Sequence, residues 1–273
     1  MSYDYPRLKL TRDPLSLVLC QVRFSAIRKM PDYIPDIQDR LRRKGFPNDA
    51  SGQGQTLVIS QTPEGLMKTD AKAVRRDEFR SKDERWAAVI GPDSLALVTT
   101  AYDRYRGFHE HLLMILQEVD AVAELRLCQV HRLGIRYIDV IEPQDGETFR
   151  DYLKGPLHGL QSDVFLDNAQ VIQSQTVGRT KEGTLSVRIW QNDQGQVVPP
   201  DILQGKPMPM RINVPMNKLI TLVDTDHFVQ GAWDYDLTSV METMDVLHQG
   251  INRAWFNDVI TPHARSAWGA TDA

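Results

Sequence analysis

Leu19-Cys20-Gln21-Val22 recurs as Leu127-Cys128-Gln129-Val130 in the 273-residue chain, and the predicted elements that follow the two copies come in a similar order. After each copy we expect a strand, a helical segment, a run of strands and a long amphipathic helix. A shared tetrapeptide alone carries little weight, but a shared succession of elements is typical of a structural unit stacked on its copy. The sequence therefore predicts two similar halves, residues 1–124 and 125–273, arranged as two units or as one continuous domain.

Apolar patterning predicts the elements of the first half. Residues 15–24 carry apolar groups on both faces, which is typical of a central buried strand. A helix headed by Pro31 is predicted from Met30 to a stop at Gly45. Strands are predicted over 56–61, 78–90 and 95–100. A helix over 104–124 follows, because its apolar residues recur at three and four positions.

The second half is predicted to begin with a strand over 125–140, in which Gly134 indicates a bulge or bend. A short helix over 145–154 comes next, and the proline-rich run 197–210 is predicted as a loop. Further strands are predicted over 169–180, 185–191, 211–214 and 219–224, and a strong amphipathic helix over 237–255. The predicted fold class is α+β. Each half is an antiparallel sheet with a long helix on one face, which resembles TATA-box-binding-protein-like or helix-grip folds.

Composition limits the classes of function. A net charge of −4 and a pI near 6.0 argue against a chain-wide basic surface, and so against strong non-specific nucleic-acid binding. No apolar run approaches the roughly 18 residues that span a bilayer. Residues 1–13 lack the apolar core of a secretory signal. We therefore expect a cytoplasmic protein with no membrane partner, in which Cys20 and Cys128 are buried thiols rather than a disulfide.

Charged residues in the predicted strands supply a candidate ligand site. Arg132 and Arg136 share one strand face, and two guanidiniums spaced in this way can hold a carboxylate or a phosphate. The alternative is an ion pair with a carboxylate of a neighbouring strand. Asp224 and Asp226 share a face just before His227, so these three residues form a candidate acid–base or metal cluster. Aspartate is also a routine turn and cap residue.

A second candidate site is basic. An anion or nucleic-acid contact surface is predicted if two groups lie together in the fold: Arg40, Arg42, Arg43 and Lys44 with Arg75 and Arg76. Interspersed acidic residues favour an ordinary solvated surface instead. The chain has no nucleophile elbow, Walker A loop, dinucleotide fingerprint or paired zinc-helix histidines. No catalytic residue, cofactor or metal site is therefore assigned, and the chain is not expected to be an enzyme.

Several short motifs resemble an uncharacterised, sporadically distributed bacterial family of about this length. They are Arg132-Leu133-Gly134-Ile135-Arg136-Tyr137-Ile138-Asp139, the strand ending in Val22-Arg23-Phe24, and the tail residues Phe256, Ile260-Thr261 and Trp268-Gly269. The resemblance covers nearly the whole chain and brings no established chemistry. Tyr105-Arg106-Gly107-Phe108 stands where the family pattern has a Tyr-Gly-Trp-like step. Sporadic occurrence implies a horizontally moving system, such as defence or toxin neutralisation.

The leading functional hypothesis is a non-catalytic binding protein with a macromolecular, most simply a protein, partner. One alternative is a small-ligand binder or enzyme with its pocket between the sheet and a long helix, at Arg132, Arg136, Asp224, Asp226 and His227. A nucleic-acid-binding protein is the other alternative. Trp255 and Phe256 are adjacent in a helix and cannot both face one core. The terminal helix over 261–268 is therefore expected to fold back over one of them, and a homodimer is the alternative.

Overall fold

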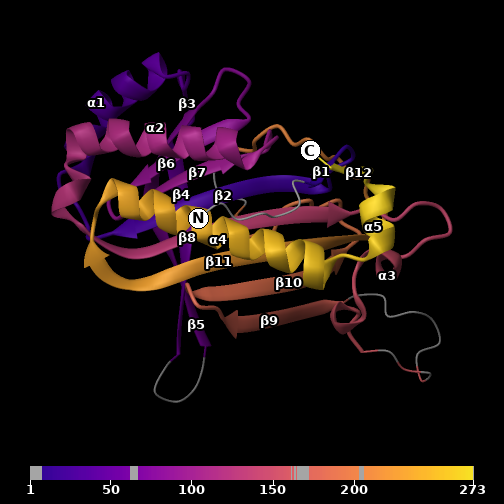
Figure 1. Cartoon of the computed structure of the whole chain (residues 1–273). Helices are drawn as coiled ribbons and strands as arrows, with labels where there is room; N and C mark the ends of the chain where they lie inside the picture. Colours follow the sequence, from indigo (N-terminus) through magenta and orange to yellow (C-terminus); the bar gives the residue numbers. More distant parts are fainter. Residues whose placement is uncertain are drawn as a thin grey trace.

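A computed structural model describes residues 8–61, 67–160, 162, 164, 172–202 and 206–272. One large sheet crosses the molecule in the order β3-β5-β6-β7-β2-β8-β11-β10-β9, and β4 pairs with β5 outside this path (Figure 1). All its neighbouring strands are antiparallel. The predicted α+β class with a large antiparallel sheet is thus confirmed.

The elements follow one another along the chain with these bounds. The strands are β1 Leu8–Leu10, β2 Leu15–Phe24, β3 Asn48–Asp49, β4 Gly52–Gln61, β5 Met67–Arg80, β6 Trp86–Gly91, β7 Ser94–Thr99, β8 Gln129–Ile141, β9 Gln173–Arg179, β10 Thr184–Asn192, β11 Ile220–Asp234 and β12 Ala270–Asp272. The helices are α1 Met30–Arg43, α2 Tyr105–Ala123, α3 Phe149–Tyr152, α4 Leu237–Ala254 and α5 Pro262–Ala267. Single helical turns lie at η1 Leu125–Leu127, η2 Gly155–Leu157 and η3 Trp255–Val259.

The three longest helices cover one face of the sheet, and α2 and α4 lie side by side on it (Figure 1). Their apolar stripes and the inward residues of the central strands form the main core. The opposite face is partly covered by residues 197–202 and 206–216, which we call the strap. Apolar strap residues pack there on side chains of β2, β7, β8 and β11. The sheet is therefore enclosed differently on its two faces, by helices on one and by the irregular strap on the other.

Both halves show the same strand order around the centre of the sheet. The opening strand β2 is followed outward by β7, β6 and β5, and the opening strand β8 by β11, β10 and β9. The tetrapeptide copies do not occupy equivalent places, however. Residues 19–22 lie in the middle of β2, whereas Leu127 ends η1 and only Gln129 and Val130 belong to β8. Cys20 and Cys128 are free, buried thiols, as expected.

Several predicted strand boundaries are wrong, and at residues 81–85 and 124–127 the reason is local. The range 78–90 is not one strand, because a turn at 81–85 separates β5 from β6, with Glu84 in the left-handed region at φ 57°. The Ser81 hydroxyl fixes this turn by accepting a hydrogen bond from the amide of Trp86 at 3.0 Å. Residues 125–127 form a helical turn after Glu124, which is also left-handed. Residues 211–214 belong to the strap, and β11 runs on to Asp234.

Gly134 does not mark a bulge, since the pairing of β8 with β11 is continuous from Arg132 to Ile141. Its missing side chain instead makes room for its neighbours. A Cβ at this position would lie 2.8 Å from Cβ of Phe228 and 2.9 Å from Nη1 of Arg132. The Arg132 guanidinium consequently lies over the strand, 4.5 Å from the centre of the Phe228 ring.

The chain end folds back as predicted. Trp255 is 7% exposed, and its ring is stacked with that of Trp268 at 6.2 Å between centroids. Phe256 packs at the edge of the same cluster, and the guanidinium of Arg265 lies over its ring. Strand β12 then pairs with β1, which joins the two ends of the described chain. A homodimer built on this tail stays a prediction.

None of the described helices is long and apolar enough to cross a membrane.

Candidate functional site

The predicted arginine and aspartate residues meet on the strap face as ion pairs. Arg136 binds Asp224 through two nitrogens, each at 2.7 Å, and binds Asp201 of the strap at 2.6 Å. Arg132 donates to Asp226 at 2.8 Å. Asp224 is 4% exposed, so its charge is held by arginines rather than by water. Ion pairing between strands, the predicted alternative, is therefore present for both arginines.

His227 does not join this cluster, which corrects the predicted three-residue site. Side chains alternate along a strand, so His227 of β11 points to the helix face while Asp224 and Asp226 point to the strap face. Its Nδ1 bonds the carbonyl of Leu247 in α4 at 2.9 Å, and its Nε2 bonds the Thr180 hydroxyl at 2.9 Å. Both ring nitrogens are satisfied, which makes His227 a buried link between sheet and helix. Among the described residues, no three metal-binding side chains gather in one place.

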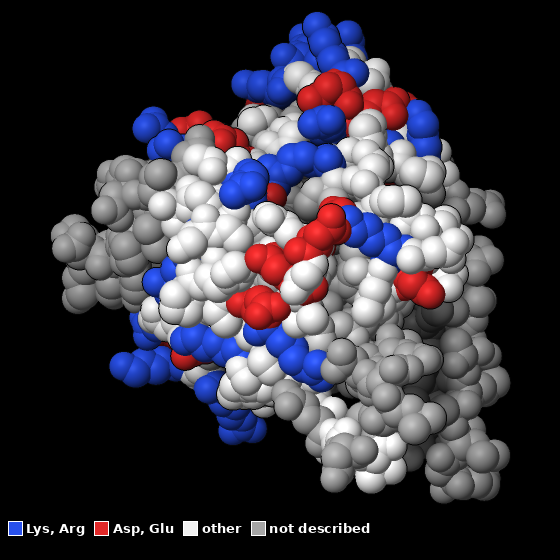
Figure 2. Space-filling view, turned by 90° about the vertical axis from the view of Figure 1, so that its right-hand side faces the viewer, with Lys and Arg blue, Asp and Glu red and all other residues white. Residues whose placement is uncertain are grey.

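The predicted basic surface is also divided. Arg40 and Lys44 pair with Glu118, whereas Arg42 and Arg43 pair with Asp39. Arg76 instead lines the strap side of the sheet. The side chain of Arg75 lies outside the described residues. Seen from the side of α3 and α5, the surface carries acidic side chains near its centre with basic ones above and below, so this face is not uniformly basic (Figure 2).

A cavity of about 580 Å³ lies between the strap and the sheet, and we call it the strap cavity. Its floor is apolar and comes from β2, β6 and β7, and its roof comes from strap residues such as Ile202 and Met208. Arg132, Arg136 and Asp226 line it. Three of the five predicted ligand residues, Arg132, Arg136 and Asp226, therefore face a cavity, but on the face opposite to the long helices. This corrects the predicted pocket position for those residues.

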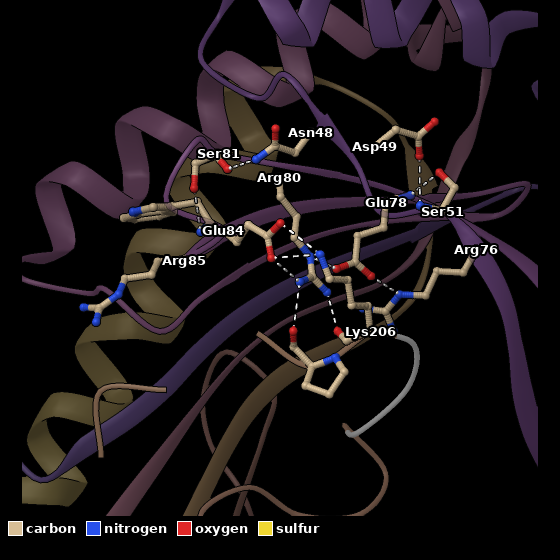
Figure 3. Close-up of polar contacts among 12 residues, drawn as sticks. Asn48, Asp49, Ser51, Arg76, Glu78, Arg80, Ser81, Glu84, Arg85 and Lys206 are labelled. Atoms are coloured by element: carbon tan, nitrogen blue, oxygen red, sulfur yellow. Dashed lines mark hydrogen bonds and ion pairs between the residues drawn. The ribbon is translucent and has the colours of Figure 1, made fainter. Parts of the chain in front are cut away.

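Arg80 fastens the middle of the strap, and Figure 3 shows its contacts. The residue has 0% exposure. Its Nε donates to Glu78 at 2.6 Å, and its terminal nitrogens donate to the carbonyls of Pro207, at 3.0 Å, and Lys206. Lys206 in turn binds Glu84 at 3.0 Å. A buried charge is tolerated only when it is paired and hydrogen-bonded, and here these bonds also fix the strap backbone.

A second cavity, of about 590 Å³, lies where the sheet, the end of α4 and the start of α2 meet near the N-terminal segment 10–15. We call it the tyrosine–histidine pocket. It occupies the position predicted for a ligand pocket, between the sheet and a long helix, but other residues line it. Its aromatic walls are Tyr102, Tyr105, Tyr137, Trp255 and Phe256.

A chain of hydrogen bonds organises one wall of this pocket. The hydroxyl of Tyr137 bonds Nδ1 of His248 at 2.8 Å and the hydroxyl of Tyr102 at 3.2 Å. Tyr105 stacks on the His248 ring with 3.7 Å between centroids, and donates to Asp245 at 2.7 Å. Burial lowers the pKa of His248 to about 3, so the ring is neutral at physiological pH.

Two carboxyl groups face this wall. Asp139 is 5% exposed, and no hydrogen bond reaches its carboxyl from any described residue. Burial raises its pKa well above the ordinary value, and the charge of Asp13 raises it further. The pKa of Asp13 is also raised by burial, although its carboxylate accepts from the Leu15 amide at 3.0 Å and lies 3.6 Å from Arg211. Arg211 is occupied by the backbone carbonyls of Asp13 and Leu15, at 2.9 and 2.6 Å.

This pocket was missed from the sequence, although two signals for it were present. The alternation that places Tyr137 on the core face of its strand also places Asp139 there, and a carboxylate at a core position is unusual. His248 likewise lies on the apolar face of α4. Comparison with protein-family models and with curated proteins finds no match for this chain. The resemblance drawn from residues 132–139 accordingly stays a prediction.

Proposed function

We propose that the protein binds a small molecule in the tyrosine–histidine pocket, and that the ligand carries a protonated amine next to an apolar, planar body. One observation carries the proposal. Asp139 is 5% exposed, it lines an open cavity of about 590 Å³, and no described residue donates a hydrogen bond to its carboxyl. A carboxyl that faces a cavity without a protein donor leaves room for a ligand to supply the partner.

The surroundings of Asp139 favour a cation over an anion. Two of the three charged groups acting on its carboxyl, Asp13 and Asp224, are acidic, and the third, Arg211, lies 3.6 Å from the Asp13 carboxylate. An ammonium group would remove the like-charge repulsion and form a charge-assisted hydrogen bond. Aromatic ring faces attract cations as well. His248 stays neutral and therefore does not repel one.

Isothermal titration calorimetry with phenethylamine, an aromatic ring with a primary amine, tests the proposal. We expect saturable binding with one site, and a loss of affinity of about tenfold or more in Asp139→Asn, because the charged acceptor is removed. Asp36→Asn, on the exposed side of α1, is the matched control and should bind like the wild-type protein. Equal affinity in wild type and Asp139→Asn would contradict the proposal.

We also propose that the two halves of the chain are structurally related. The equal strand order of β2-β7-β6-β5 and β8-β11-β10-β9 supports related halves joined at β2 and β8, in a helix-grip-like arrangement. The two tetrapeptides lie at different positions in their elements, so they do not support this proposal. A macromolecular partner, including one in a defence or toxin system, stays a hypothesis, since no described surface identifies such a partner. A pull-down from native cells tests it.

A further inference from the structure

The strap cavity has the chemistry of a second, separate ligand site. It reaches from β5 to β11, six neighbouring strands of the sheet, so it extends over five strand spacings or about 24 Å. A volume of about 580 Å³ over this length makes a narrow, elongated space. Between charged side chains on β5 at one end and on β8 and β11 at the other, its walls are apolar, with Leu17, Leu19 and Val98 in the floor and Val198, Ile202 and Met208 in the roof. This shape suits one extended apolar chain rather than a ring system.

Charge at the cavity favours an anionic head group. Five basic side chains and three acidic ones line it among the described residues: Arg76, Arg80, Arg132, Arg136 and Lys206 against Glu78, Asp201 and Asp226. Arg80 and Arg136 are fully engaged by buried carboxylates and strap groups. Arg132 differs, because a single nitrogen donates to Asp226 and the rest of the guanidinium meets no acceptor among the described residues.

Arg132 is also held in place for recognition. The absent side chain of Gly134 and the ring of Phe228 fix its guanidinium over β8. A preorganised guanidinium can take a carboxylate through two parallel hydrogen bonds. Asp226, its present partner, contacts the guanidinium through a single nitrogen at 2.8 Å, so the other nitrogens of Arg132 can take a second carboxylate.

We propose that the strap cavity binds an apolar chain that ends in a carboxylate, with the carboxylate on Arg132 and the chain between the floor and the strap. The site is independent of the tyrosine–histidine pocket, since the two cavities lie on opposite faces of the sheet and share no lining residue. Asp226 competes with the ligand for Arg132. Methionines of the roof adapt to the chain because their side chains are unbranched and flexible.

Dodecanoate is the probe, titrated calorimetrically into the full-length protein below its micelle-forming concentration, with dodecyltrimethylammonium as the probe of opposite charge. We expect saturable binding of dodecanoate and at least about tenfold weaker binding of the cation. Arg132→Gln should weaken dodecanoate binding about tenfold, whereas Asp226→Asn should strengthen it, because the competing carboxylate is gone. Arg126→Gln, an exposed arginine paired with Glu124, is the matched control and should change nothing.

The opposite signs of the two variants separate a specific site from loose hydrophobic binding. If Arg132→Gln fails to fold, Asp226→Asn alone decides the question, and Ala96→Phe, which fills the cavity floor, should abolish binding. Absence of dodecanoate binding, equal binding of both probes, or weaker binding by Asp226→Asn overturns the proposal. Phenethylamine binding should be unchanged in all these variants, so failure here is distinguishable from failure at the other pocket.

Discussion

Arg80→Met is expected to lower the free energy of unfolding by about 3–5 kcal/mol, because it removes one of the two arginines that pair with the buried Glu78 carboxylate. Arg80 has 0% exposure and Glu78 has 1%, and their side chains are bonded at 2.6 Å. In the variant, Arg76 remains as the partner of the Glu78 carboxylate. The backbone carbonyls of Lys206 and Pro207 in the strap lose their hydrogen-bond donor. Urea denaturation followed by circular dichroism measures the change.

Two further variants identify the cause of this loss. Arg126→Met removes an exposed ion pair with Glu124 and should change stability by less than about 0.5 kcal/mol. Glu78→Gln combined with Arg80→Met should be more stable than Arg80→Met alone, because the buried charge that Arg80 no longer balances is removed as well. If Arg80→Met is as stable as the wild-type protein, this network does not fasten the strap to the sheet.

Asp139→Asn is expected to stabilise the free protein at pH 7 while it removes amine binding. In the unfolded chain the carboxyl ionises near the ordinary aspartate pKa of 3.8, whereas burial holds the folded pKa well above that value. Between the two pKa values the folded state binds more protons, so stability falls as the pH rises. The neutral amide of the variant is free of this penalty.

The stability difference between Asp139→Asn and the wild-type protein should depend on pH, whereas a difference caused by packing would not. The stability advantage of Asp139→Asn should be small near pH 4 and grow toward pH 8. His248, whose neutral form is favoured by burial, destabilises the protein as pH falls below about 6.5, but it is present in both proteins and cancels in the comparison. Urea denaturation at pH 5 and pH 8 measures the difference. An advantage that is constant with pH would show that ionisation of Asp139 is not its cause.

Local pattern was enough for the three long helices and for the faces of the long strands, whereas the helix predicted over 145–154 is only the four residues of α3, Phe149–Tyr152. The spacing of apolar residues predicted α1, α2 and α4 within a few residues, because one buried stripe on a helix needs that spacing. Alternation also placed Arg132 and Arg136 together on one face, where they meet Asp224 and Asp226. It failed at residues 81–85, where side-chain hydrogen bonds of Ser81 and Asp83 form a turn inside an otherwise strand-like run.

The ligand pockets depended on tertiary structure and could not be located from the sequence in the same way. Four segments, at 10–15, 102–106, 137–139 and 248–256, build the tyrosine–histidine pocket together with Arg211 of the strap, and no local signal joins them. Strand alternation places Asp139 on the core face of β8, and this alone could have identified it as one polar residue of the pocket. The strap cavity depends on where a segment without periodicity crosses the sheet. That path is set by Arg80, Arg136 and the hydroxyl of Thr100, which donates to the Pro209 carbonyl at 2.7 Å.

The pKa of Asp139, measured by carbon NMR of its carboxyl with and without phenethylamine, tests the central claim most directly. In the free protein we expect a pKa well above the ordinary value for aspartate, because the carboxyl is buried beside Asp13 without a hydrogen-bond partner among the described residues. Saturation with the amine should lower this pKa, since an adjacent ammonium stabilises the carboxylate. An ordinary pKa in the free protein, or a raised pKa that the amine leaves unchanged, would contradict the assignment of Asp139 as the amine-binding group.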